Sequence, residues 1–219
     1  MNYTELTASI KAYCENDFPQ AVGAGGLTSA EQIARFVQQA EQRIYNSIQF
    51  PALRKNVTGS STVNNKYLAT PVDWLATFSL ARINADGSYE YLLNKDVNYI
   101  REAFPFPATS GAPTHYAIFD DNTFILGPTP DDSYSMELHY FYYPTSITTA
   151  GTSWLGTNLD SLLLYGSLLE AAAFMKSDAD VIKNYTDRYN EAFLMGKQLG
   201  DGKDRQDMYR TLQVRYPVK

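Results

Sequence analysis

The sequence has little of the chemistry on which enzymes and metalloproteins rely. It contains a single cysteine, Cys14, so no disulfide can form within the chain. Its two histidines, His115 and His139, have no cysteine or carboxylate at the spacing of metal ligands, which indicates structural histidines. No phosphate-binding loop, serine-hydrolase elbow or dinucleotide-binding glycine motif occurs. We therefore expect a protein without catalytic activity, cofactor or metal.

Two pairs of adjacent aspartates come nearest to a catalytic arrangement. Asp120–Asp121 and Asp131–Asp132 would supply the two carboxylates of a glycoside hydrolase. Each pair, however, stands beside asparagine, glycine, proline or serine, where aspartate side chains usually bond to the backbone of a tight turn. The sequence thus favours two turns over an active site.

Positively charged residues are in the minority. The chain has 18 lysines and arginines against 24 aspartates and glutamates, a net charge of −6. A protein that holds DNA irrespective of its sequence is normally basic, because it must neutralise phosphates. The negative net charge therefore argues against a protein that binds nucleic acid tightly and without sequence preference.

Long hydrophobic runs and a secretory leader are missing as well. The most apolar stretch, residues 159–176, includes Asp160 and Glu170 and is a poor membrane span. The first residues are polar and lack the basic start and apolar core of a signal peptide. We expect a protein of the cytoplasm, or of a particle assembled there, and not of a membrane.

The chain is organised around a strand and two helices between residues 135 and 199. In the strand, residues 135–143, successive side chains point to opposite faces. One face carries Met136, Leu138, Tyr140 and Tyr142, and the other carries Glu137, His139, Phe141 and Tyr143. A loop rich in serine, threonine and glycine is expected to follow.

The first helix, residues 159–176, is apolar nearly all round, which predicts burial on several sides. A second helix, residues 179–199, is expected to begin after Asp178 and to end at Gly200. Two helices alone cannot bury the first one, so a third must pack against it.

The third helix lies far upstream, at residues 28–48. Thr28 and Glu31 form the signature of a capping box at its start, and apolar residues follow at spacings of three and four. A shorter helix is expected at residues 3–17, followed by a glycine-rich connection at 21–27.

Most residues between the upstream helix and the strand at 135–143 predict β structure. Short strands are expected at 66–69, 77–83, 89–93, 116–119 and 123–126. Asp86-Gly87 is a hairpin turn, and Asp96 caps a short helix at 97–104. Trp74 is expected in the core, whereas Trp154 either caps the helices or faces a partner.

Together these elements predict an α+β fold, in which a bundle of three main helices carries an inserted antiparallel β domain. The expected boundaries are an N-terminal segment at 1–27, the bundle at 28–50 and 155–200, a β-rich insertion at 51–154 and a C-terminal docking tail at 201–219.

The C-terminal tail allows two interpretations. It holds five basic and three acidic residues, a net charge of +2, and alone it cannot bury enough apolar surface to become ordered. Yet apolar and polar residues alternate at 211–216, as in a strand that joins another sheet edge. The tail is therefore either solvated or a docking arm. The candidate docking residues are Arg205, Tyr209, Arg210, Leu212, Arg215 and Tyr216.

Five motifs resemble, in their order and spacing, the head-to-tail connector adaptors of tailed bacteriophages, especially the adaptor and tubular tail proteins of short-tailed phages. They are YLATPVDWL at 67–75, SGAPTHYAI at 110–118, FILGPTPD at 124–131, LHYFYY at 138–143 and DSLLLYGSLLEAA at 160–172. The resemblance extends over residues 28–199.

This resemblance implies a structural virion protein without catalytic residues. Copies would form a dodecameric ring beneath the portal, around the channel through which DNA passes, and would provide the platform for a tail or nozzle protein. The protein would lie in the neck of the virion after assembly in the host cytoplasm, and the docking residues would contact the portal or a neighbouring subunit. The alternative is a carbohydrate-binding or other tail-associated binding module, which the 17 tyrosines favour.

Overall fold

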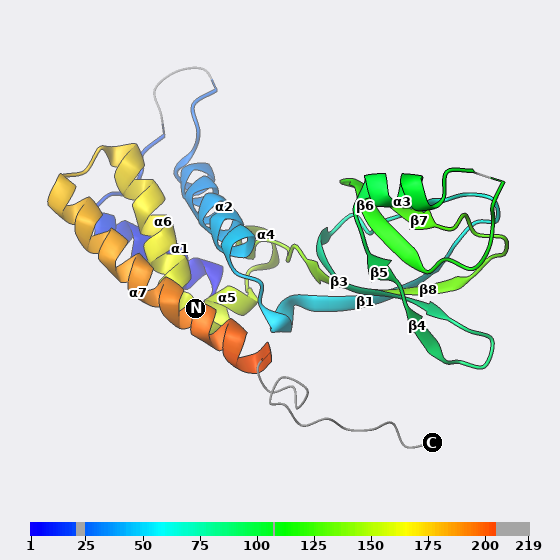
Figure 1. Cartoon of the computed structure of the whole chain (residues 1–219). Coiled ribbons are helices and arrows are strands. Elements are labelled where there is room, and N and C mark those ends of the chain that lie inside the picture. Colours follow the sequence, from blue (N-terminus) through cyan, green and yellow to red (C-terminus); the bar gives the residue numbers. More distant parts are fainter. Residues whose placement is uncertain (21–24, 107, 205–219) are drawn as a thin grey trace. The chain divides into compact units, whose positions relative to one another are not determined.

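The computed structural model describes residues 1–20, 25–106 and 108–204, and side chains only as far as residue 200. Within these residues it has seven α-helices and two four-stranded sheets, so the predicted α+β class is confirmed. The chain divides into two compact units (Figure 1). Met1–Pro51 and Pro144–Lys219 form the helical unit, and Ala52–Tyr143 form the β unit. Among the described residues, no α-helix combines the length and the hydropathy that a transmembrane span requires.

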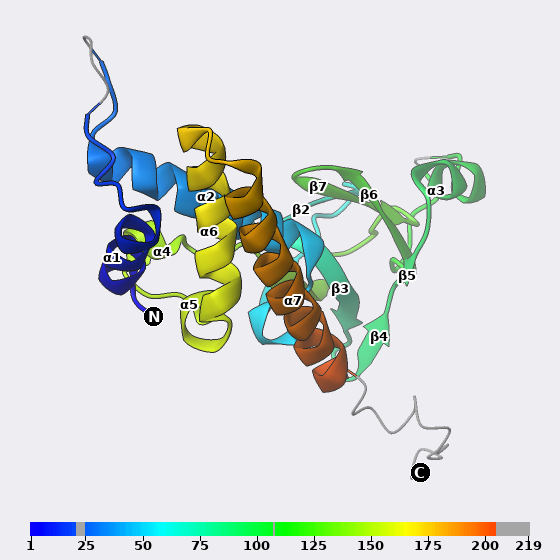
Figure 2. The same ribbon diagram turned by 90° about the vertical axis from the view of Figure 1, so that its left-hand side faces the viewer.

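The helical unit is built around helix α6, Asp160–Met175. It packs against α2, Ser29–Ser47, and against α7, Ala179–Asp204 (Figure 2). Its buried side chains come from almost every direction around the axis, as its apolar composition predicts. At Gly166 an added Cβ would lie 3.2 Å from the Cβ of Ala40 and 3.3 Å from Cε2 of Tyr189, so glycine allows the three helices to approach closely.

The prediction of three main helices is not confirmed, because a fourth helix shares this core. Helix α1, Tyr3–Cys14, also packs against α6, and its Leu6 and Ile10 are fully buried. A capping box between Asn2 and Glu5 fixes its start. The corresponding box between Thr28 and Glu31 at the start of α2 is confirmed.

The predicted end of the last helix at Gly200 is wrong, because α7 continues to Asp204. Gly200 is buried, and an added Cβ would lie 3.5 Å from the carbonyl oxygen of Gln49 and 3.8 Å from a methyl group of Ile48. The glycine therefore serves close packing against the segment that follows α2, and does not end the helix.

The predicted loop after the strand at 135–143 contains two short helices. Helix α4, Ile147–Ala150, and helix α5, Trp154–Asn158, each begin after a serine whose side chain accepts a backbone hydrogen bond. The buried Glu41 of α2 accepts a hydrogen bond from the backbone nitrogen of Ile147 at 3.0 Å, which ties α4 to the bundle. Burial raises the pKa of this carboxyl, although its hydrogen bonds to Ser146 and Ile147 act in the opposite direction.

The β unit contains two sheets. Sheet A has the order β1 (Arg54–Ser60), β8 (Ser135–Tyr142), β3 (Trp74–Ile83) and β4 (Tyr89–Tyr91). Sheet B has the order β2 (Tyr67–Ala69), β7 (Thr123–Gly127), β6 (His115–Asp120) and β5 (Leu93–Asn94). All pairs are antiparallel except β5 with β6, and helix α3, Val97–Ala103, lies beside β6 and β7.

The main core of this unit holds buried side chains from both sheets. Met136, Leu138 and Tyr140 of β8 all contribute to it, as the alternation of that strand predicts. Trp74 packs on the same core, with its ring 5.6 Å from that of Phe124, so its expected core position is confirmed.

The strand predicted at 89–93 divides between the two sheets. The backbone nitrogen of Leu92 bonds to the carbonyl of Leu80 in sheet A, whereas that of Leu93 bonds to the carbonyl of Thr114, just before β6 in sheet B. Leu92 itself is buried in the core, so the chain crosses from one sheet to the other at this residue.

Candidate interaction surfaces

The outer face of sheet A carries a cluster of aromatic rings and a guanidinium group. It is the face that β8 turns away from the core, and it holds His139 and Phe141, with Arg54 of β1 opposite Phe141 in the pairing register. Phe78 joins them from β3 at a register shift between Thr77 and Ser79. Such bulges redirect a side chain, and here the ring joins the outer face.

Close ring contacts hold this cluster together. The guanidinium carbon of Arg54 lies 4.0 Å from the ring centre of Phe78 and 4.9 Å from that of Phe141. The rings of Phe78 and His139 meet edge to face at 5.1 Å. Phe78 nevertheless remains 50% exposed. An exposed aromatic ring fixed by a cation is typical of a protein interface, where such side chains supply contact area at low entropic cost.

Two tyrosines extend this outer face toward β4. The hydroxyl of Tyr89 donates a hydrogen bond to Glu137 at 3.0 Å, and this bond raises the pKa of the tyrosine. Tyr91 is 66% exposed. The outer face of sheet A, defined by Arg54, Phe78, Tyr89, Tyr91, His139 and Phe141, is therefore the first candidate interaction surface. Its exposed rings are those of Phe78, Tyr89 and Tyr91, whereas Phe141 is buried and packs against Phe78.

A hydrogen-bonded network joins the opposite, core-facing side of β8 to the turn before β3. Asp73 accepts hydrogen bonds from Lys55, at 2.5 Å, and from the hydroxyl of Tyr140, at 2.8 Å. Burial disfavours the charge of Asp73, but these hydrogen bonds and the lysine charge outweigh it and lower the pKa of the carboxyl. Burial, together with the bond to Asp73, raises the pKa of Tyr140 to about 12.

This network predicts a loss of stability at alkaline pH. Because the folded pKa of Tyr140, about 12, lies above the ordinary value of 10.0, folding favours the neutral phenol. The contribution of the neutral Tyr140 to the free energy of unfolding is fully present below pH 10 and is lost as the pH rises to about 12. Urea titrations of the wild type and of Tyr140→Phe should show a gap in unfolding free energy that narrows over this interval. Tyr91→Phe, which changes an exposed tyrosine, serves as the control. If the difference in unfolding free energy between the wild type and Tyr140→Phe did not change between pH 10 and pH 12, the raised pKa of Tyr140 would be contradicted.

The second candidate surface is the free edge of β1 together with an apolar groove. Six of the seven residues of β1 are exposed, and the strand pairs with β8 alone among the described strands. A cavity of about 290 Å³ opens between β1 and β2. Its lining residues include Val57, Gly59, Leu68, Phe124, Met136 and Leu138.

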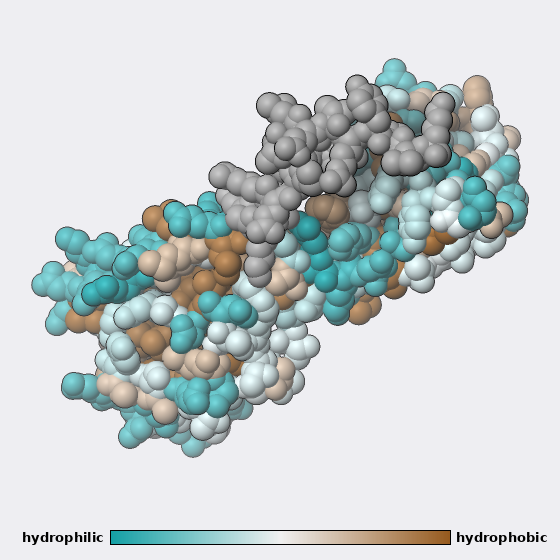
Figure 3. All heavy atoms as spheres, turned by 90° about the horizontal axis from the view of Figure 1, so that it is seen from below, coloured by the Kyte–Doolittle hydropathy of each residue, from teal (hydrophilic) through white to brown (hydrophobic). Residues whose placement is uncertain are grey.

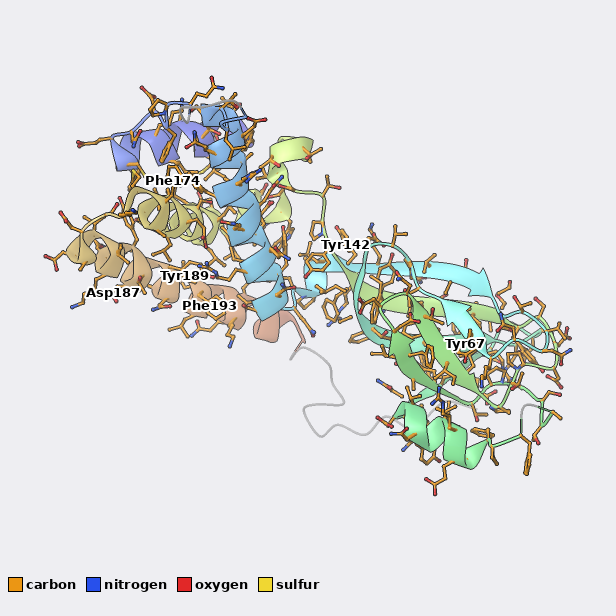
Figure 4. All side chains as sticks on the ribbon, turned by 90° about the horizontal axis from the view of Figure 1, so that it is seen from above. Tyr67, Tyr142, Phe174, Asp187, Tyr189 and Phe193 are labelled. Carbon is orange, nitrogen blue, oxygen red and sulfur yellow. The ribbon has the colours of Figure 1, made fainter. Side chains whose placement is uncertain are left out.

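The helical unit also exposes apolar side chains. Leu194 and Met195 of α7 are 60% and 56% exposed, and Phe174 at the end of α6 is 55% exposed while its ring lies 5.4 Å from that of Phe36. Figure 3 shows brown, apolar patches among hydrophilic areas, and Figure 4 labels Phe174 on α6 and Tyr189 and Phe193 on α7. Trp154, at the start of α5, packs on the buried Phe50 with a distance of 4.8 Å between the ring centres, a contact within the helical unit that agrees with the first of its two expected roles.

Several of the residues weighed as catalytic or metal-binding candidates make local contacts within turns and strands. Asp120 and Asp132 accept hydrogen bonds from the backbone nitrogens of Asn122 and Ser133, so the turn interpretation is confirmed for one aspartate of each pair. Asp131 instead accepts a hydrogen bond from the hydroxyl of Tyr134. His115 contacts the hydroxyl of Thr114 at 2.8 Å. Within residues 1–20, 25–106 and 108–204, no three histidines, cysteines or carboxylates gather as a metal site would require.

All six predicted docking residues, Arg205, Tyr209, Arg210, Leu212, Arg215 and Tyr216, lie outside the described residues, so their role stays a prediction. Sequence reasoning did not identify β1, Phe78 or Arg54 as parts of a surface. The alternation of β8 pointed to one half of the outer face, but β1 has no apolar alternation of its own that would have revealed the other half.

Comparison with known proteins agrees with the resemblance seen in the sequence. No curated protein matches the chain. The model of the family described as SU10 adaptor protein matches residues 1–215, almost the entire chain. This match also includes the first helix and most of the tail, which lie beyond the motifs that carried the resemblance. The chain therefore belongs to the SU10 adaptor protein family of phage adaptors.

Proposed function

We propose that the protein is a structural subunit of the virion neck, a head-to-tail adaptor that forms a ring beneath the portal. The observation that carries this proposal is the family match over residues 1–215. In this role the ring surrounds the DNA channel and provides a platform for a tail or nozzle protein. It does not recognise the base sequence of the DNA that passes through it. The protein acts through its surfaces and carries out no chemical reaction.

Ring assembly requires that each copy present two different surfaces. In a heterologous contact one face of a subunit meets another face of the next, and the rotation between them closes the ring. The outer face of sheet A and the free edge of β1 differ from each other within the β unit, so each copy offers distinct surfaces and neither has to bind its own counterpart. They support a closed ring, for which we propose twelve copies.

The charge of the protein supports passage of DNA without retention. A lining of immobile cations would hold phosphates, whereas the net charge of −6 is compatible with sliding. The wall of the channel is proposed to be neutral to acidic. The polar face of α2, which includes Gln38, Gln39 and Gln42, and the turn aspartates are the candidates for it.

The tail completes the proposal as a docking arm. Of the predicted tail, 201–219, the first four residues belong to α7, so the proposed arm is 205–219. Its arginines, Arg205, Arg210 and Arg215, would pair with carboxylates of the portal or of a neighbouring subunit. Tyr209, Leu212 and Tyr216 would fill apolar pockets there.

Electron microscopy of the full chain mixed with portal rings of the same phage tests the proposal. We expect rings with a central hole seated on the portal, and we expect a glycan array to stay blank. Exposed rings such as Phe78 and Tyr91 would also suit a sugar-binding surface. Strong glycan binding without affinity for the portal would therefore favour the carbohydrate-binding alternative and overturn the ring.

A further inference from the structure

The free edge of β1 is unlike the other sheet edges of the protein. Folded proteins protect their edges by keeping them short, by placing charges or prolines on them, or by bulges. Strands β2 and β4 have three residues each and β5 has two, so these edges are short. Strand β1 has seven residues, and it pairs with β8 without a register shift. Its two charges, Arg54 and Lys55, stand at its beginning, and residues 56–60 carry neither a charge nor a proline.

The groove beside this edge is apolar and open. The register places Val57 opposite Leu138 and Gly59 opposite Met136, so both residues of β1 lie on the core-facing side. An added Cβ at Gly59 would meet no atom within 4 Å. With about 290 Å³, the groove has roughly ten times the volume that one water molecule occupies in the liquid. Side chains of an added strand would therefore find apolar room next to β1.

One segment of the chain has the pattern that this edge requires. In residues 211–216, Leu212, Val214 and Tyr216 alternate with threonine, glutamine and arginine. In a strand they would all lie on one face. Placed beside β1, this face would cover the groove, while the polar face would continue the solvent side of sheet A.

We propose that residues 211–216 of one copy add as a fifth strand to β1 of the neighbouring copy. The inference rests on the proposed ring, because only there does a second copy stand beside the first. Backbone hydrogen bonds along β1 supply the affinity, and the groove selects the apolar face. Each copy gives one strand and receives one, which is a heterologous contact of the kind that closes a ring. Residues 205–210 connect the end of α7 to this strand and span about 20 Å when extended.

Hydrogen exchange of the full chain tests this pairing. In rings assembled on the portal, the β1 amides that point away from β8 should exchange about tenfold more slowly, or slower still, than in the free protein. Val214→Asp should remove this protection, because it places a charge in the apolar groove. Gln213→Asp adds the same charge to the opposite face of the strand and should retain the protection.

A second pair of variants tests the acceptor. Val57→Lys places an inward-pointing charge on the edge and should remove the protection, whereas Val72→Lys, at a fully exposed valine of the same unit, should not. Both variants should keep the thermal transition of the wild type.

The possible outcomes separate this inference from the proposed function. Rings without protection at 54–60, or equal effects of the two aspartate variants, would overturn the strand addition and leave the ring standing. Protection already present in the free, dilute protein would show pairing within one copy and overturn the exchange between neighbours. If no rings form, the proposed function fails, and the exchange between neighbours fails with it.

Discussion

Replacement of Leu163 by alanine is expected to lower the free energy of unfolding of the helical unit by about 2–5 kcal/mol. Leu163 is fully buried in α6, the helix against which α1, α2 and α7 all pack. The shorter side chain would leave a cavity that several helices would have to close at once. Denaturation followed by far-ultraviolet circular dichroism measures the effect.

Leu194→Ala provides the matched control for this experiment. It removes the same atoms from α7, but at a position that is 60% exposed, so a change within about 0.5 kcal/mol is expected. If the two variants lost equal stability, or if Leu163→Ala did not shift the transition, the central position of α6 would be wrong.

The main helices were predictable because their signals are local. The capping box at Thr28 and the apolar composition of α6 each follow from neighbouring residues, and the structure places both helices close to the expected boundaries. Gly200 was misread because a helix end and a close helix contact both favour glycine. Only the position of Gln49 beside it, which is a tertiary fact, distinguishes the two.

The missed elements depend on contacts that are distant in sequence. Strand β1 contains asparagine, threonine, glycine and serine, which predict a loop, and it is extended because β8 pairs with it along its length. Helix α4 has only four residues, and Glu41, more than a hundred positions upstream, anchors its first turn. Neither arrangement leaves a periodic pattern in the local sequence.

The outer face of sheet A also combines a part that local sequence predicts with a part that depends on contacts distant in sequence. The alternation of β8 identified His139 and Phe141 as one face of a strand. It could not identify Arg54 and Phe78 as their neighbours, because the first comes from β1 and the second from a register shift in β3. Side-chain patterns thus predict what one strand offers, whereas the composition of a surface follows from the order of strands in the sheet.

Truncation of the chain after Asp204 is expected to abolish attachment to portal rings while leaving the folded units intact. The cut preserves α7 to its last residue and removes all six predicted docking residues. The removed residues are mostly polar or charged and cannot form a core by themselves. The melting temperature should therefore change by less than about 2 °C. Co-sedimentation with portal rings should bring down the full chain, and the shortened chain should stay in the supernatant.

A second truncation, after Tyr216, is the control that makes this result specific. It removes only the last three residues and keeps every predicted docking residue, so it should sediment with the portal as the full chain does. Loss of binding in both truncations would place the contact in the last three residues. Equal binding by all three proteins would mean that the tail is solvated, and attachment would then have to come from surfaces of the folded units, of which the aromatic outer face of sheet A is the foremost candidate.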